Sequence, residues 1–288
     1  MKSFNKVISL MALLVFSLVL AVGCGGGNDA AEKKVLKIGQ APYDYEIPIV
    51  EITKVIGSEQ GYEIEVVEGD IGFMFLSLTQ GDIDAWAGVW LPSIHNSYQE
   101  KYGDKYDLGS AFFEDAPVGW VAPKYVEVDS IAELKGNEDA VNGKLTGFEP
   151  GSGMMLVSEE IIKGYELDLE LVSGSSSSMM AEADYAITHK EPIVFLGWRP
   201  HTMMRKYDLK FLEDPKGYWE LDSEYWGIRK GLNEYAPDMN NFFNNFKMSL
   251  DEVESFLYAY EVEGQSVETL AKDWVEKNRS DIDAWLKG

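Results

Sequence analysis

Two segments of the sequence place a tryptophan, a proline and a histidine together at the end of an apolar run. They are VWLPSIH at 89–95 and FLGWRPH at 195–201. The face of an aromatic ring attracts a cation, and each contact contributes about 0.5–1 kcal/mol when exposed and about 2 kcal/mol when desolvated. A lone tryptophan is more often part of a core, but two in matching positions favour binding. Trp90 and Trp198, with Tyr43 of PYDYE, are therefore candidates for an aromatic box.

A quaternary ammonium group is the cation that such a box would select. It carries no N–H group, so it loses little when the rings exclude water, whereas a primary amine would leave buried donors unpaired. Three ring contacts would supply several kcal/mol toward the roughly 8 kcal/mol of a micromolar complex.

The segment EPGSGMM at 149–155 has the composition of an anion-binding turn. It precedes an expected helix, whose first backbone N–H groups lack partners within the helix and whose dipole favours negative charge. The segment matches neither a nucleotide-binding P-loop nor a G-x-S-x-G nucleophile elbow. An aromatic box for a cation beside a site for an anion would together bind a zwitterion. His95 is then interpretable as a donor to the carboxylate, or as a cap on the helix that follows it.

The two tryptophan motifs belong to an internal repeat. Gly39 begins GQAP after one apolar strand, Gly147 begins GFEP after another, and each glycine precedes its tryptophan by 51 positions. GYEIEV in the first unit is similar to GYELDL in the second, and KYDL occurs in both. Self-similarity of this kind indicates two structural units with one order of elements.

Periodicity predicts alternating strands and helices in both units. Such alternation is typical of parallel α/β sheets, which bind ligands at the carboxyl ends of their strands. The candidate loops all follow strands, so they would line one cleft between two lobes. A helical tail over 232–288 is expected to pack on the first lobe. The expected strands are 35–39, 63–67, 83–89, 144–148, 167–172 and 193–197, and the expected helices are 46–57, 72–80, 153–163 and 178–189.

The N-terminus has the features of a bacterial lipoprotein signal peptide. An apolar stretch at 7–22 is shorter than a membrane-spanning helix needs to be. Ala21-Val22-Gly23-Cys24 resembles a lipobox, so Cys24 would become the lipidated mature N-terminus. The expected parts of the chain are a signal peptide at 1–23, a flexible tether at 24–33, lobe I at 34–119 and 226–288, and lobe II at 120–225, joined near 118–124 and 221–230.

Composition opposes several classes of function. The 288 residues include 49 acidic and 25 basic side chains, and this net charge of −24 opposes binding to nucleic acid or to an anionic membrane surface. Cys24 is the only cysteine, so the folded part has neither a disulfide nor a thiolate metal site. No cofactor and no metal is indicated. We expect a monomeric, extracytoplasmic protein that is held at the membrane by its lipid anchor alone.

These features resemble the substrate-binding proteins of ABC importers for glycine betaine and related compatible solutes. The resemblance covers nearly the whole mature chain, and its specific motifs are W-L-P-x-x-H, G-W-x-P-H, K-Y-D-L-K-F-L-E-D-P-K and E-P-G-S-G. It implies a type II periplasmic-binding-protein fold that closes on solute between its lobes, and partner permease and ATPase subunits. It also implies that Trp90 and Trp198 wall the ammonium box, and that His95 and the backbone N–H groups of Gly153 and Met154 hold the carboxylate.

The chain departs from the family pattern at the third wall of the box. Family members commonly have a further tryptophan where this chain has Tyr43 or Ser152. A tyrosine keeps an aromatic face and adds a hydroxyl group, so the box is retained. The preferred solute stays open among glycine betaine, proline betaine, choline, carnitine and other amines, although choline lacks the carboxylate that the glycine-rich loop anticipates.

Two alternatives from other classes remain. A sensory module that reports ligand to a receptor would share the binding site. An exported hydrolase would need a nucleophile with a base, or a metal cluster, but His95, His189 and His201 show no metal-type spacing. We therefore expect no enzymatic activity. His201 and Ser152, together with Asp44 beside Tyr43, are candidate cleft-lining residues.

Overall fold

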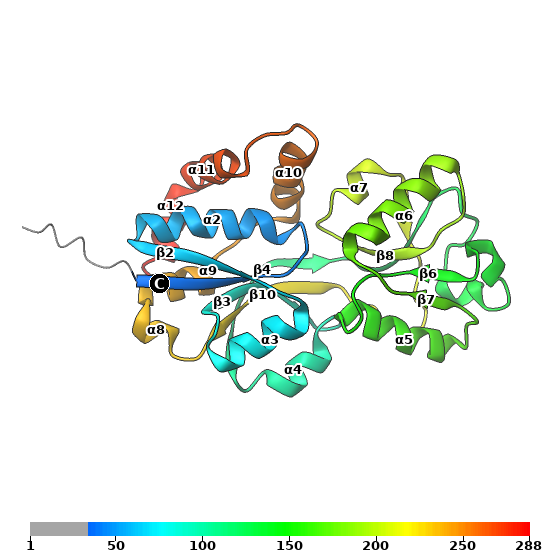
Figure 1. Cartoon of the computed structure of the whole chain (residues 1–288), viewed down its shortest axis with the longest axis horizontal. Coiled ribbons are helices and arrows are strands. Elements are labelled where there is room, and N and C mark those ends of the chain that lie inside the picture. Colours follow the sequence, from blue (N-terminus) through cyan, green and yellow to red (C-terminus); the bar gives the residue numbers. More distant parts are fainter. Residues whose placement is uncertain (1–33) are drawn as a thin grey trace, which may run out of the picture. The chain divides into compact units, whose positions relative to one another are not determined.

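The computed structural model describes residues 34–288, so the predicted signal peptide, tether and lipidated Cys24 lie outside the described residues. These residues form two five-stranded sheets, each with helices on both faces (Figure 1). We call the parts built around them lobe I and lobe II. The strands of the lobe I sheet, in spatial order, are β2 (Tyr62–Glu68), β1 (Lys34–Gln40), β3 (Ala85–Leu91), β10 (Asp222–Arg229) and β4 (Tyr106–Ala116).

The lobe II sheet repeats this arrangement. Its strands, in spatial order, are β7 (Glu170–Val172), β6 (Lys144–Thr146), β8 (Phe195–Trp198), β5 (Val118–Pro123) and β9 (Leu209–Phe211). Strand β6 pairs in parallel with both of its neighbours, β7 and β8, as β1 of lobe I does with β2 and β3. The remaining two pairings in each sheet are antiparallel, so the expected mostly parallel sheets are mixed.

The internal repeat corresponds to one β-α-β-α-β unit in each lobe, which confirms the predicted two-lobed α/β fold. Capping residues determine where its helices begin and end. Asp70 caps α3 by accepting from the Phe73 N–H, and Gly81 ends that helix with φ of 76°. Ser175 and Ser178 form a capping box for α6. The helices are α2 (Glu46–Glu59) and α3 (Ile71–Gln80) in lobe I, and α5 (Gly153–Tyr165) and α6 (Ser176–His189) in lobe II.

The chain passes between the sheets at Pro117, which separates β4 from β5, and again between β9 and β10. The predicted linkers near 118–124 and 221–230 instead contain β5 of lobe II and β10 of lobe I, because these strands extend each sheet up to the crossing. The predicted boundaries between the lobes, at 119/120 and 225/226, lie a few residues after the first residues of β5 and β10. The assignment of residues to the two lobes remains a prediction.

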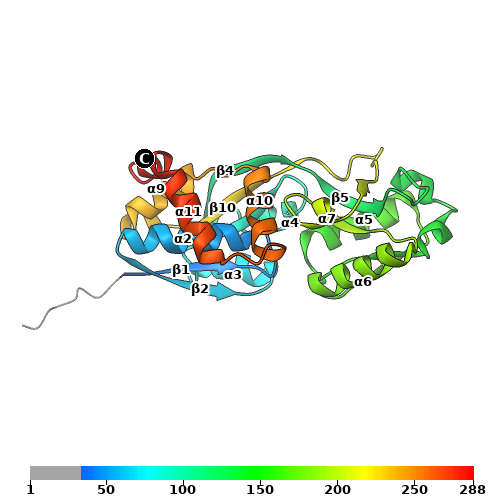
Figure 2. The same cartoon turned by 90° about the horizontal axis from the view of Figure 1, so that it is seen from above.

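The C-terminal helices pack on lobe I, with α11 against α2 and α9 against β4 (Figure 2). Three of their aromatic side chains, Phe242, Phe243 and Phe246, are fully buried. None of the helices among residues 34–288 is both long and apolar enough to cross a membrane. The remaining helices are α4 (Asn96–Tyr102), α7 (Met203–Lys206), α8 (Leu232–Tyr235), α9 (Pro237–Asn245), α10 (Leu250–Glu261), α11 (Val267–Lys277), α12 (Arg279–Trp285) and two short 3-10 turns at Ile131–Leu134 and Glu138–Val141.

Candidate functional site

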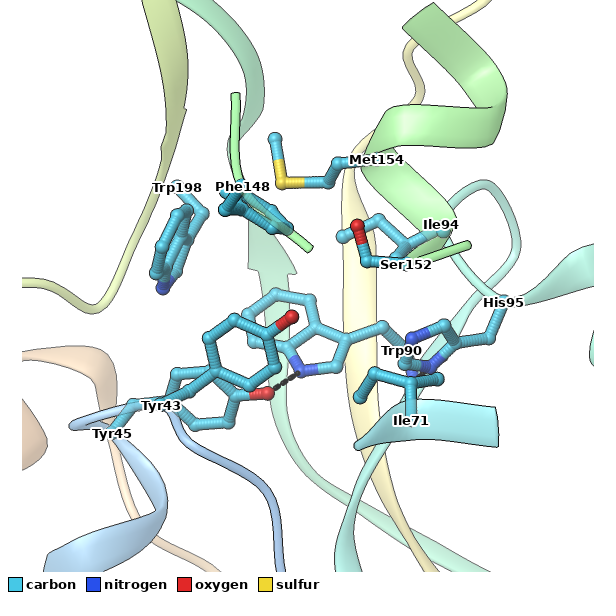
Figure 3. A pocket seen from close by; sticks show the side chains of 11 residues that line it. Tyr43, Tyr45, Ile71, Trp90, Ile94, His95, Phe148, Ser152, Met154 and Trp198 are labelled. Atoms are coloured by element: carbon cyan, nitrogen blue, oxygen red, sulfur yellow. Dashed lines mark hydrogen bonds between the residues drawn. The ribbon is translucent and has the colours of Figure 1, made fainter. Parts of the chain in front are cut away.

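A pocket lies where loops of the two lobes meet, and 11 residues line it (Figure 3). The space there that holds no protein atoms, including the part open to solvent, amounts to about 330 Å³. Seven of the predicted site residues line this pocket, whereas Asp44 and His201 do not. The lining residues are Tyr43, Tyr45, Ile71, Trp90, Ile94, His95, Phe148, Ser152, Gly153, Met154 and Trp198.

Lobe I contributes three aromatic walls. The rings of Tyr43 and Tyr45 stack with centroids 5.8 Å apart and an interplanar angle of 10°. The Trp90 ring meets Tyr45 edge to face at 5.4 Å, and its Nε1–H donates to Tyr45 Oη at 3.0 Å, the dashed bond in Figure 3. This bond fixes the orientation of the indole, so Trp90 presents a defined face to the pocket.

Lobe II contributes the opposing walls, Phe148 and Trp198. Their rings meet at 77° with centroids 5.6 Å apart. Tyr43 reaches both across the pocket, at 5.8 Å from Phe148 and 5.9 Å from Trp198. Together with Tyr45 and Trp90 these rings are at most 8% exposed. Water is therefore largely excluded, the condition in which a cation–π contact is strongest.

The other side of the pocket is the N-terminus of α5. The first hydrogen bond of this helix runs from the Leu156 N–H to the Ser152 carbonyl, at 3.1 Å, so the N–H groups of Gly153 and Met154 precede the helical ladder. Ser152 is the N-cap residue but makes no side-chain cap. Its buried Oγ, like Nε1 of Trp198, has no hydrogen-bond partner within residues 34–288. The Gly153 and Met154 N–H groups, with the Ser152 hydroxyl, are suited to an anionic ligand.

His95 is held by the strand that precedes it. Its Nδ1 accepts from the Trp90 backbone N–H at 3.0 Å, so Nε2 carries the proton of the neutral ring. Burial lowers the pKa of His95 to about 3, although a hydrogen bond with the Gly88 backbone opposes the shift. The ring is therefore neutral at physiological pH. The alternative role as a side-chain cap is not seen, because His95 makes no capping bond to α4.

Buried carboxylates hold the loops that carry these side chains. Glu46 accepts from the Ala41 N–H at 2.8 Å and from Nε1 of Trp86 at 3.1 Å, which fixes the loop bearing the two tyrosines. Asp222 accepts from the N–H groups of Ser93 and Ile94 at 2.7 and 2.9 Å, which fixes the loop before His95. Both carboxylates are fully buried, and both act on backbone donors.

Asp44 and His201 lie outside the pocket lining, on opposite lobes. Nε2 of His201 is 3.8 Å from Oδ2 of Asp44, and its Nδ1 accepts from the Met203 N–H at 3.0 Å. The His201 ring packs edge to face on Trp198 at 4.8 Å. Burial lowers the pKa of His201 to about 4, so its contact with Asp44 is that of a neutral ring. His189 is exposed at the end of α6.

Sequence reasoning missed four lining residues: Tyr45, Phe148, Ile71 and Ile94. Two of them carried a usable signal, because Tyr45 and Phe148 are aromatic and lie in the same loops after β1 and β6 as Tyr43 and Ser152. Ile71 and Ile94 carried none, since an isoleucine next to a helix start is common in any core.

Glu224 is a fully buried carboxylate opposite Trp90 in the β3–β10 ladder. Neither of its oxygens has a hydrogen-bond partner in the part of the chain that the structure describes. Burial, with Glu46 nearby, raises its pKa well above the usual 4.5. The folded state therefore keeps a proton that the unfolded state releases above pH 4.5, so the free energy of unfolding falls as the pH rises through this range.

We expect Glu224→Gln to be more stable than the wild type at pH 7. Glutamine has a similar shape and does not titrate, so the free energy of unfolding of the variant does not fall with pH as that of the wild type does. The gain is about 1.4 kcal/mol for each pH unit between the unfolded and folded pKa, and it vanishes near pH 4.5. Thermal unfolding at pH 4.5 and pH 7 measures it, with the exposed Glu63→Gln in the same sheet as the control. A pH-independent difference, or a less stable variant at pH 7, would contradict the assignment.

Comparison with known proteins gives a consistent set of relatives. A family model described as the substrate binding domain of ABC-type glycine betaine transport system matches residues 34–277. The glycine betaine/carnitine transport binding protein GbuC of Listeria monocytogenes is 33% identical over 154 residues. That alignment covers 52% of this chain and 51% of the relative, so the matched part spans about half the length of that protein.

Two solved structures resemble the whole described region. Lactococcal OpuAC, in its closed-liganded conformation complexed with glycine betaine, is 30% identical with a TM-score of 0.82, over 88% of this chain and 99% of that chain. The glycine/betaine/L-proline-binding protein ProX of Borrelia burgdorferi is 31% identical with a TM-score of 0.83, over 88% of this chain and 96% of that chain.

Proposed function

Because the chain belongs to the family of substrate-binding domains of ABC-type glycine betaine transport systems, we propose that it is an extracytoplasmic receptor for a betaine-type zwitterion. The family consists of transport receptors and not of enzymes. The observation that carries the proposal is the pocket itself, in which five aromatic rings surround a space that ends at a helix N-terminus. In this role the protein would deliver its solute to permease and ATPase subunits in the membrane.

The proposed roles follow the chemistry of the two ends of the pocket. The quaternary ammonium would lie among Tyr43, Trp90 and Trp198, whose buried faces attract a cation that needs no hydrogen bonds. The carboxylate would accept from the N–H groups of Gly153 and Met154, where the dipole of α5 favours negative charge. His95 would donate from Nε2, the nitrogen that carries its proton, by exchanging its hydrogen bond with the Gly88 backbone for one to the carboxylate.

Calorimetric titration of residues 25–288 with a solute panel tests this function. Glycine betaine and proline betaine are expected to bind with micromolar affinity, and glycine to give no heat of binding, because its primary ammonium would leave buried donors unpaired. Choline should bind more weakly than glycine betaine, since it cannot use the N-terminus of α5. Carnitine, named for the Listeria relative, belongs in the panel. Binding of none of the quaternary amines would refute the proposal.

The proposed receptor is held at the membrane by a lipid on Cys24, after removal of residues 1–23, and acts as a monomer. The support is the lipobox-like Ala21-Val22-Gly23-Cys24. A Cys24→Ser variant should appear in the soluble fraction of cells that express it, whereas the wild type stays with the membranes. Equal partition of both proteins would contradict lipidation.

A further inference from the structure

Helix α10 of lobe I contacts the segment of lobe II that follows Trp198, and α10 lies beside α7 in both views (Figures 1 and 2). The centre of this contact is Glu254, whose side chain is 2% exposed. Its Oε1 accepts from Arg199 Nε at 2.7 Å and its Oε2 from Arg199 Nη2 at 2.9 Å. Two parallel bonds of this kind are the strongest form of an arginine–carboxylate pair.

Further contacts surround this pair. Arg205 Nε donates to Oε2 of Glu254 at 3.2 Å, so one carboxylate joins two guanidinium groups of lobe II. Arg199 Nη2 also lies 3.6 Å from Asp251, which is 84% exposed. One face of α10 therefore contacts the 199–205 segment through two of its acidic residues, Asp251 and Glu254.

The two partners of the pair belong to different lobes, which determines when the pair can form. Arg199 is the residue directly after Trp198, the lobe II wall of the pocket. Glu254 is part of the C-terminal helical region, which packs on lobe I. If the lobes separate, both groups regain water, so neither lobe needs the pair for its own packing. Breaking a pair of this burial changes mainly the dissociation rate of a complex.

We propose that Glu254 is a positioning residue that holds the Trp198 wall against lobe I, so that bound solute leaves only after the Arg199–Glu254 pair breaks. This inference rests on the proposed function, because it concerns release of the betaine-type solute. Glu254 itself does not line the pocket.

The test is the dissociation rate of glycine betaine from Glu254→Gln, followed by stopped-flow tryptophan fluorescence. We expect dissociation to be at least ~10-fold faster than in the wild type, with little change in the association rate. The thermal midpoint of the ligand-free protein should change little. Asp251→Asn on the same helix is the matched control, since its exposed carboxylate should contribute almost nothing. An unchanged dissociation rate in Glu254→Gln would overturn the proposal.

A double-variant cycle separates the pair from other effects on α10. Arg199→Gln alone should also accelerate release, and adding Glu254→Gln to it should accelerate release much less than Glu254→Gln does in the wild type, because only the contact with Arg205 is then left to lose. Additive effects of the two changes would overturn the pairing, whatever the single variants show.

A readout without solute distinguishes this proposal from the proposed function. Fluorescent labels on Glu65→Cys in lobe I and Glu182→Cys in lobe II, both exposed, report the distance between the lobes in a Cys24→Ser background. Glu254→Gln should shift the ligand-free protein toward larger label separation. Failure of every quaternary amine to bind would refute the function alone, whereas an unchanged distance distribution would refute the role of Glu254.

Discussion

Gly153→Ala is expected to abolish betaine binding while the protein stays folded. A Cβ atom on residue 153 would lie 1.8 Å from the carbonyl oxygen of Ile94 and 2.5 Å from its carbonyl carbon. Both are backbone atoms, and the Ile94 N–H is held by Asp222 at 2.9 Å, so this loop cannot easily move aside. Gly153 begins α5 in lobe II and Ile94 follows β3 in lobe I. The added methyl group therefore blocks the approach of the lobes and leaves each lobe intact.

The expected loss of affinity for glycine betaine is at least ~100-fold, or about 2.7 kcal/mol, measured by calorimetry. Gly72→Ala is a suitable control, because its Cβ would meet only Asp70 Oδ1 at 3.4 Å and Tyr98 Oη at 3.6 Å, ordinary contact distances. Both variants should unfold near the wild-type temperature. If Gly153→Ala bound betaine as the wild type does, the close approach of α5 to Ile94 could not be part of the bound state.

The internal repeat made the main strands and both tryptophan walls predictable. A shared β-α-β-α-β order places Trp90 and Trp198 at equivalent strand ends, and the structure brings both to one pocket. The antiparallel strands could not be found in this way. Strand β10 lies between β3 and β4, more than a hundred residues away in sequence, so its place in the sheet is set by tertiary pairing.

The direction in which single side chains point also could not be predicted from the sequence. Tyr43 and Tyr45 lie two positions apart beside a helix start, and only the turn geometry at Ala41 and Glu46 brings both rings to the pocket. Phe148 is aromatic and close to a strand end, but the expected strand 144–148 includes it, so its position alone does not distinguish a pocket residue from a core residue. Its contact with Trp198 depends on how two loops of lobe II meet.

The buried acids show why composition misleads here. Among 49 acidic residues the sequence offers no way to distinguish a solvated carboxylate from one that orders a loop. In the structure, Glu46, Asp222 and Glu254 each accept two or more hydrogen bonds from a segment next to the pocket. The fold therefore determines which carboxylates are buried and which are solvated. The net negative charge of the sequence indicates only which partners are favoured and how soluble the protein is.

Removing the lobe II tryptophan wall should weaken betaine binding and leave the anion side of the pocket unchanged. In Trp198→Ala the ammonium group loses a desolvated ring contact of about 2 kcal/mol, so affinity should fall at least ~10-fold and by about 30-fold if the whole contact is lost. Trp198→Phe retains an aromatic face and should recover part of the loss. Trp90→Ala should cost at least as much, because it also leaves Tyr45 without its indole donor.

The ligand dependence of this loss identifies its cause. Glycine betaine and choline share the quaternary ammonium but not the carboxylate, so loss of a ring contact should weaken both by a similar factor. Trp285→Ala, which removes an indole packed against Phe242 and Phe246 on lobe I, should lower the unfolding temperature and leave betaine affinity unchanged. Wild-type affinity in both Trp90→Ala and Trp198→Ala would mean that the ammonium does not lie among these rings.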